Sequence, residues 1–123
     1  MDPILDNPRS LSRAASAMRC LPFRLGLYRL LEQEAISSVA LWARTDAETL
    51  CSTRLTPDDT ETLFIWLIRL GVLRREVDGQ GLTERVRLTP MGRQLLAGWS
   101  QEIPRAGWKE QLRHAISRYR PRL

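Results

Sequence analysis

The stretch from Leu63 to Trp99 constrains the fold of this chain most, because its signals come in the order helix, hairpin, helix. Positions 63–68 form an unbroken apolar run, and Gly71 follows shortly after it. An apolar run closed by a glycine is typical of a buried helix that ends at a C′ glycine. The sequence therefore predicts that the last helix of a core ends near residue 70.

A β-hairpin is predicted directly after this helix. Two runs of strand-forming residues, 72–77 and 82–88, flank the loop DGQG at 78–81. A short glycine-containing loop between two such runs favours antiparallel pairing, with one or both glycines at positive φ. Thr89 and Pro90 then indicate a new helix, because threonine caps helix starts and the missing N–H of proline costs nothing in the first turn.

The part of the chain before this block is predicted to be mainly helical, because its apolar residues recur at spacings of three and four. The predicted elements are an irregular arm at 1–8, a helix at 9–20, a helix from Pro22, and a short helix from about Ser37 or Ser38 through Ala43. The connection that follows, 45–56, is longer than the turn of a helix-turn-helix, so part of it must be loop.

A strong helix start precedes the apolar run. Thr56 can act as the N-cap, Pro57 suits the first turn, and Asp58 and Asp59 interact favourably with the helix dipole. We therefore expect a helix over 57–70.

Positive charge is concentrated at the C-terminus. The chain has a net charge of +5, and residues 104–123 contain six Arg or Lys against Glu110 alone, which accounts for the entire excess. Apolar residues at helical spacing predict an amphipathic basic helix over 104–123, with Trp108 and Tyr119 holding it to the rest of the domain.

The composition indicates one globular domain over residues 1–123, since 43% of the residues are hydrophobic and 27% are charged. The order of the predicted elements places the core of this domain at 22–103. No apolar run is long enough to cross a bilayer and no signal peptide is evident, so we expect a cytoplasmic location and no membrane partner. Cys20 and Cys51 are isolated, which predicts reduced, buried thiols and no metal site. His114 is the only histidine and has no nucleophile at a suggestive spacing, so we predict no catalytic residue, cofactor or enzymatic activity.

The blocks Gly71–Gly81 and Arg87–Leu96 together resemble the wing and following helix of bacterial winged-helix regulators of the MarR and PadR types. With the motif RCLPFRL at 19–25, the chain is more similar to a small, uncharacterised winged-helix family of cyanobacteria, over most of its length. The resemblance implies an α+β, mainly α fold, a winged helix-turn-helix with extra N- and C-terminal helices and a two-stranded β-hairpin wing. It also implies double-stranded DNA as the partner, with the helix at 57–70 as recognition helix and the hairpin at 72–88 as wing.

The residues themselves fit DNA only in part. Asp58, Asp59 and Glu61 would repel a duplex, although a role at the helix start also explains the two aspartates. The hairpin carries opposite charges, so it either presents arginines to a minor groove or pairs with itself. The candidate DNA-binding residues are Arg69, Arg74, Arg85, Arg87, Arg113, Arg118 and Arg120.

The four tryptophans suggest more apolar surface than one small core needs. We expect Trp42 and Trp99 in the core, and a homodimer or another protein to cover the rest. The candidate residues of this interface are Ile65, Trp66, Trp108, Leu112 and Tyr119.

Two functions remain open at this point. The leading hypothesis is a dimeric DNA-binding transcriptional regulator, which the basic C-terminus and the resemblance favour. The alternative is a winged-helix protein–protein interaction module without sequence-specific DNA binding, which the acidic helix start favours. Arginines of the hairpin and of the terminal helix that converge on one face would favour DNA, and their dispersal would not.

Overall fold

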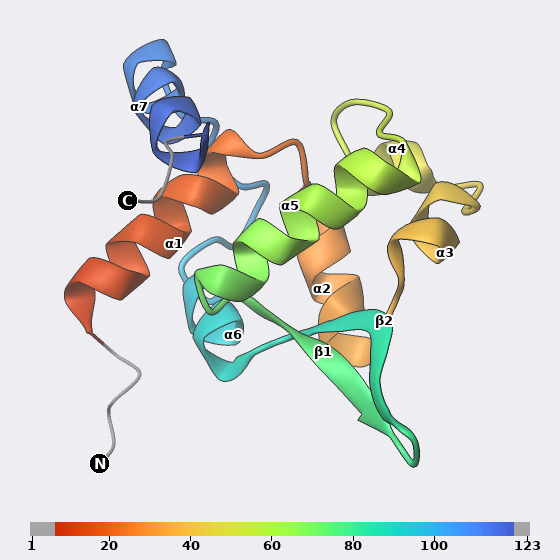
Figure 1. Cartoon of the computed structure of the whole chain (residues 1–123). Helices are drawn as coiled ribbons and strands as arrows, with labels where there is room; N and C mark the ends of the chain where they lie inside the picture. The colour runs from red at the N-terminus through yellow and green to blue at the C-terminus, as the bar shows by residue number, and fades with distance from the viewer. Residues whose placement is uncertain (1–6, 120–123) are drawn as a thin grey trace.

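The computed structural model describes residues 7–119 and shows an α+β, mainly helical fold with one two-stranded antiparallel sheet (Figure 1). The predicted fold class is thereby confirmed at this level. The elements in chain order are α1 (Pro8–Cys20), α2 (Leu25–Gln33), α3 (Ser38–Trp42), α4 (Ala47–Leu50), α5 (Pro57–Arg69), β1 (Leu73–Asp78), β2 (Gly81–Leu88), α6 (Pro90–Leu96) and α7 (Trp108–Tyr119). Of the predicted arm at 1–8, residues 1–6 lie outside the described residues and Pro8 already belongs to α1.

Polar side chains fix the starts of the main helices. Thr56 Oγ1 accepts a hydrogen bond from the Asp59 amide at 3.1 Å, and Thr89 Oγ1 accepts one from the Gly92 amide at 3.0 Å. Asn7 caps α1 in the same way. Each cap contributes about 1 kcal/mol. The predicted starts of α5 and α6 are therefore confirmed.

The helix predicted to begin at Pro22 begins at Leu25 instead. The backbone of residues 22–24 pairs with the segment after α4, where the Arg24 amide donates to the Leu50 carbonyl at 2.8 Å and the Ser52 amide donates to the Pro22 carbonyl at 2.7 Å. These bonds hold the chain extended just where the proline was expected to start a helix.

The predicted hairpin is present and is irregular in its middle. Asp78 pairs with Gly81, Leu73 pairs with Leu88, and the register shifts between Arg75 and Val77. Gly81 has a φ of +117°, as expected for one of the two loop glycines.

A short extra pairing ties the base of the hairpin to the segment between α2 and α3. The amides and carbonyls of Ile36 and Val86 exchange hydrogen bonds of 3.1 and 2.9 Å. The hairpin is therefore fixed to the body of the protein at the buried Val86.

The core lies between α1, α2, α5 and the base of the hairpin. Phe23 packs against Phe64 and Tyr28 with ring centroids 5.6 and 6.3 Å apart, and all three side chains are fully buried. Trp99 packs at the edge of this core. The prediction for Trp42 was wrong, because its side chain is exposed on α3 and lies under the Arg54 guanidinium, 4.0 Å from the ring centroid.

Helix α7 packs against α1 with its polar side inward, whereas the hairpin projects from the opposite side of the molecule (Figure 1). Trp108, Leu112 and Ile116 are 71%, 55% and 59% exposed. The expectation that Trp108 anchors the helix to the domain was therefore wrong. In the described part of the chain, no helix is long and apolar enough to cross a membrane.

Candidate functional site

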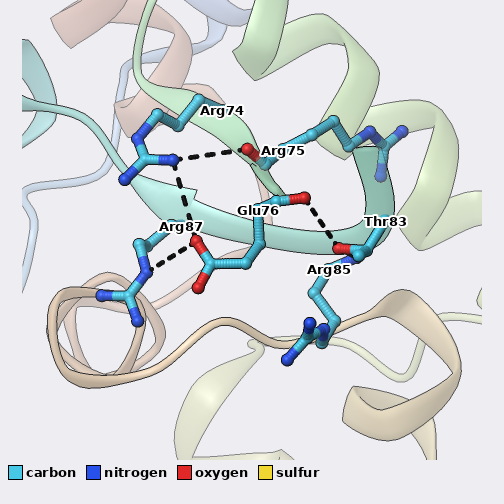
Figure 2. Close-up of polar contacts among 6 residues, drawn as sticks. All are labelled: Arg74, Arg75, Glu76, Thr83, Arg85 and Arg87. Carbon is cyan, nitrogen blue, oxygen red and sulfur yellow. Dashed lines mark hydrogen bonds and ion pairs between the residues drawn. The ribbon is translucent and has the colours of Figure 1, made fainter. Parts of the chain in front are cut away.

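The hairpin arginines were the first candidates for DNA contact, and two of them share one carboxylate. Glu76 Oε1 lies 3.2 Å from Arg87 Nε and 3.7 Å from Arg74 Nη1. Figure 2 shows Glu76 between these two arginines, on one side of the hairpin. The carboxylate holds both guanidinium groups in place and reduces the charge that they present outward.

A third hairpin arginine, Arg75, is bound to the body of the protein. Its guanidinium forms an ion pair with Glu61 of α5 and donates to the Glu84 carbonyl at 3.0 Å. Glu61 also accepts a hydrogen bond from Ser38 Oγ at 3.3 Å, so one carboxylate links α3, α5 and the hairpin. Alternating charges along the hairpin indicated pairing within it, but this partner lies on α5 and only the structure reveals it.

Arg85 is different from the other hairpin arginines. Its exposed side chain points away from Glu76, as Figure 2 shows. No hydrogen bond or ion pair joins this guanidinium to another of the described residues. The same holds, within residues 7–119, for Arg69, which is exposed at the end of α5.

A groove of 440 Å³ separates α3 and the start of α5 from the hairpin. Asp58, Glu61 and Glu84 line it, and Arg75 is the basic residue that faces them. Leu82 and Val39, also in its lining, are 76% and 58% exposed. We refer to this acidic and apolar surface as the hairpin groove.

The C-terminal arginines lie elsewhere. Arg113 is exposed on α7, and Arg118 is partly buried there and engaged in interactions with its surroundings. Arg120 lies outside the described residues. Since α7 lies on the far side of the molecule from the hairpin, the structure does not bring the two groups of arginines onto one face (Figure 1).

The candidate interface residues fall into two groups. Ile65 is 38% exposed on the outer side of α5, and Trp108 and Leu112 form an exposed apolar stripe on α7 with Ile116. Trp66 is partly buried by its own chain, because its Nε1 donates to His114 Nε2 on α7 at 3.0 Å and the two rings meet edge to face. The side chain of Tyr119 is outside the described part of the structure.

Charged and polar contacts attach α7 to α1. Glu110 accepts a hydrogen bond from Ser16 Oγ at 2.6 Å and forms an ion pair with Arg19. The hydrogen bond from Ser16, together with Arg19, lowers the pKa of Glu110.

Burial lowers the pKa of His114, and the nearby Arg118 adds to this effect. A neutral imidazole is the form that can accept the Trp66 N–H.

Both cysteines of the chain are free thiols. Burial raises the pKa of Cys51 to about 11, so the thiol is protonated at neutral pH and a poor nucleophile. Cys20 is only partly buried and is also a free thiol. Among residues 7–119 no group of three His, Cys, Asp or Glu side chains is arranged to hold a metal ion.

Comparison with known proteins places the chain in a family. It matches the profile of the Npun_F0494-like family over residues 4–118, and it therefore belongs to that family. Comparisons with curated proteins and with solved structures gave no match. The match agrees with the expected membership of a small family.

Proposed function

We propose that this member of the Npun_F0494-like family is a winged-helix protein-interaction module whose hairpin groove binds a basic and apolar segment of another protein. In this proposal α3 and α5 are the two helices of a helix-turn-helix, and β1 and β2 form the wing. The order of the elements supports the proposal, as does the pairing of Ile36 with Val86, which adds a short first strand beside the hairpin.

The observation that carries the proposal is the chemistry of the hairpin groove. In a DNA-binding winged helix, the recognition helix enters the major groove and the wing lies alongside the duplex. Here the corresponding groove contains three carboxylates against one arginine, and that arginine is already paired with Glu61. A polyanion would be repelled, whereas lysine or arginine side chains would be attracted.

The exposed apolar residues of the hairpin groove support a protein partner as well. Leu82 of β2 and Val39 of α3 line the groove and are 76% and 58% exposed. Val77 pairs with Leu82 from β1, outside the lining, and is 60% exposed. Apolar side chains surrounded by charged ones are typical of protein interfaces, in which an apolar centre has a polar rim.

The first test maps the partner surface directly. A photo-crosslinking amino acid at Leu82 should give a discrete protein adduct in cells, whereas the same residue at the exposed Gln94 of α6 should not. With the purified adduct partner, Asp58→Lys combined with Glu84→Lys should weaken binding at least about tenfold. Glu48→Lys, at an exposed position of α4 outside the groove, is the control. Unchanged binding by the double variant would contradict the proposal.

DNA binding is the second candidate, because Arg69 and Arg85 are exposed and have no partner among the described residues. We would measure the binding of fluorescent duplexes at several salt concentrations. If these two arginines touch phosphates, Arg69→Gln with Arg85→Gln should make the slope of log K against log salt shallower by about 1.8. That result would replace the protein-interaction proposal.

A further inference from the structure

A second groove lies between α1 and α7, away from the hairpin groove, and has a volume of 350 Å³. Three arginines line it: Arg9 and Arg13 of α1, and Arg113 of α7. Trp66 and Leu70 of α5 contribute its apolar part. We refer to this surface as the arginine groove.

Regular spacing on the two helices builds the arginine groove. Residues three, four and seven positions apart share one face of a helix, and both helices contribute such a set. The sets are Arg9, Ser12, Arg13 and Ser16 on α1, and Glu110, Arg113, His114 and Ser117 on α7. Helix α1 therefore presents two serine hydroxyls beside two arginines, and α7 presents the hydroxyl of Ser117 beside Arg113.

The positive charge of this groove is only partly offset by the protein, through the attraction between Glu110 and Arg113. No ion pair or hydrogen bond joins the side chains of Arg9, Arg13 or Arg113 to another of the described residues. Glu110 is the acidic residue in the lining, and it is already engaged by Arg19 and Ser16. Three guanidinium groups are thus available to a ligand with several acceptor oxygens.

The size and lining of the groove point to a small molecule. Its volume falls in the range of small-ligand sites, which combine an apolar surface with a few polar groups that fix orientation. Arginine forks match the oxygens of a phosphate, and serine hydroxyls add further donors. The indole of Trp66 and the side chain of Leu70 offer apolar contact to the rest of the ligand.

We propose that the arginine groove binds a small phosphate ester whose organic part is flat or apolar, such as a mononucleotide. Arg9, Arg13 and Arg113 hold the phosphate, Ser12 and Ser117 donate hydrogen bonds to it, and the organic part lies against Trp66 and Leu70. This site is independent of the hairpin groove and does not rest on the protein-interaction proposal.

The experiment is a calorimetric titration of the full chain with AMP, adenosine and inorganic phosphate. AMP should bind at least about tenfold more tightly than either of the other two, because only AMP engages both parts of the groove. Arg13→Gln combined with Arg113→Gln should weaken AMP binding by at least about tenfold. The matched control is Arg29→Gln with Arg93→Gln, which removes two exposed arginines outside the groove and should leave the affinity unchanged. All variants alter exposed side chains, and a thermal melt checks their folding.

Several outcomes would overturn the proposal. If inorganic phosphate bound as tightly as AMP, the apolar part of the groove would not contribute to binding. If adenosine bound as tightly as AMP, the arginines would not contribute. A single-stranded dodecanucleotide that binds more tightly than AMP, and less tightly to the Arg13/Arg113 variant, would make the groove a nucleic-acid surface. Absence of AMP binding at millimolar concentration, or an unchanged affinity in the Arg13/Arg113 variant, would equally exclude the proposed site.

Discussion

Two carboxylates set how much positive charge the hairpin presents to a partner. Glu76 holds Arg74 and Arg87, and Glu61 holds Arg75. Ion pairs at such partly exposed positions contribute only about 0–1 kcal/mol to stability. Their larger effect here is on binding, because they orient the guanidinium groups and screen their charge.

Removal of Glu76 should therefore expose more basic surface than removal of another hairpin carboxylate. We expect Glu76→Gln to elute from a heparin column at higher salt than the wild-type protein, because Arg74 and Arg87 are both released. Glu84→Gln removes the same formal charge, but the side chain of Glu84 forms no ion pair with a described residue, so it is the control. Equal elution of the two variants would contradict this account.

The two glycines of the hairpin turn should respond differently to substitution. Gly81 has a φ of +117°, and we expect Gly81→Ala to lower the free energy of unfolding by about 1–3 kcal/mol. Gly79 does not have a positive φ, and a Cβ there would meet nothing within 4 Å. Gly79→Ala should thus stay within about 0.5 kcal/mol of wild type in urea titrations. If both variants lowered the free energy of unfolding by a similar amount, the difference in backbone conformation between Gly79 and Gly81 would be contradicted.

The hydroxyl of Tyr28 is a further test at this scale. It is completely buried and makes no hydrogen bond with a described residue. Tyr28→Phe removes this group without changing the packing of the ring, so the free energy of unfolding should stay the same or rise by up to about 1 kcal/mol. A clear loss of stability in urea would mean that the hydroxyl is hydrogen-bonded in solution.

The starts of α5 and α6 and the hairpin could be predicted from local signals, because caps, proline and turn glycines act within a few residues. The start of α2 could not, because residues 22–24 pair with a segment almost thirty positions away. The orientation of α7 on the rest of the protein could not be predicted from the sequence either. Helical spacing shows that Trp108, Leu112 and Ile116 share a face, but it does not show which face points inward.

The attachment of α7 should depend on pH through His114, the only histidine of the chain. Its pKa in the folded protein is lower than the ordinary value of 6.5, so the unfolded chain binds a proton at higher pH than the folded one. The contribution of neutral His114 to the free energy of unfolding is therefore fully present above pH 6.5, and it is lost as the pH falls below 6.5 towards the pKa of the folded state. We expect a lower free energy of unfolding at pH 5.5 than at pH 7.5.

The variant His114→Gln separates this effect from other titrations. The amide oxygen of glutamine can accept the Trp66 N–H and does not titrate, so the difference between the two pH values should disappear. The indole N–H resonance of Trp66 in proton NMR should shift with pH in the wild-type protein and stay constant in the variant. If the resonance of the wild-type protein is unaffected by pH, His114 does not control this contact.

At the scale of the whole molecule, charge is divided between two sides. Carboxylates gather in the hairpin groove, whereas unpaired arginines line the groove between α1 and α7. The sequence correctly indicated an acidic start of α5 and a basic terminal helix. It could not indicate that Arg9 and Arg13 lie beside Arg113, because that proximity depends on the packing of the two ends of the chain.

The exposed stripe on α7 leads to a prediction about the oligomeric state. We expect a homodimer at micromolar concentration in which Trp108, Leu112 and Ile116 are covered, seen in sedimentation as twice the chain mass of 14.2 kDa. Leu112→Glu should shift the protein to the monomer. Ser117→Glu, which places the same charge at another exposed position of α7, should not. A wild-type protein that sediments as a monomer would contradict the prediction.

The polar attachment of α7 also bears on the local motions of the protein. Separation of α7 from α1 and α5 breaks the contacts of Glu110 with α1 and of His114 with Trp66, but little apolar surface of α7 itself is uncovered, because its apolar stripe already faces solvent. Such an opening is nearly insensitive to denaturant, whereas opening of α5, with Phe64 and Leu67 fully buried, requires global unfolding. In native-state hydrogen exchange, added urea should therefore accelerate the amides of α5 and leave those of α7 almost unchanged.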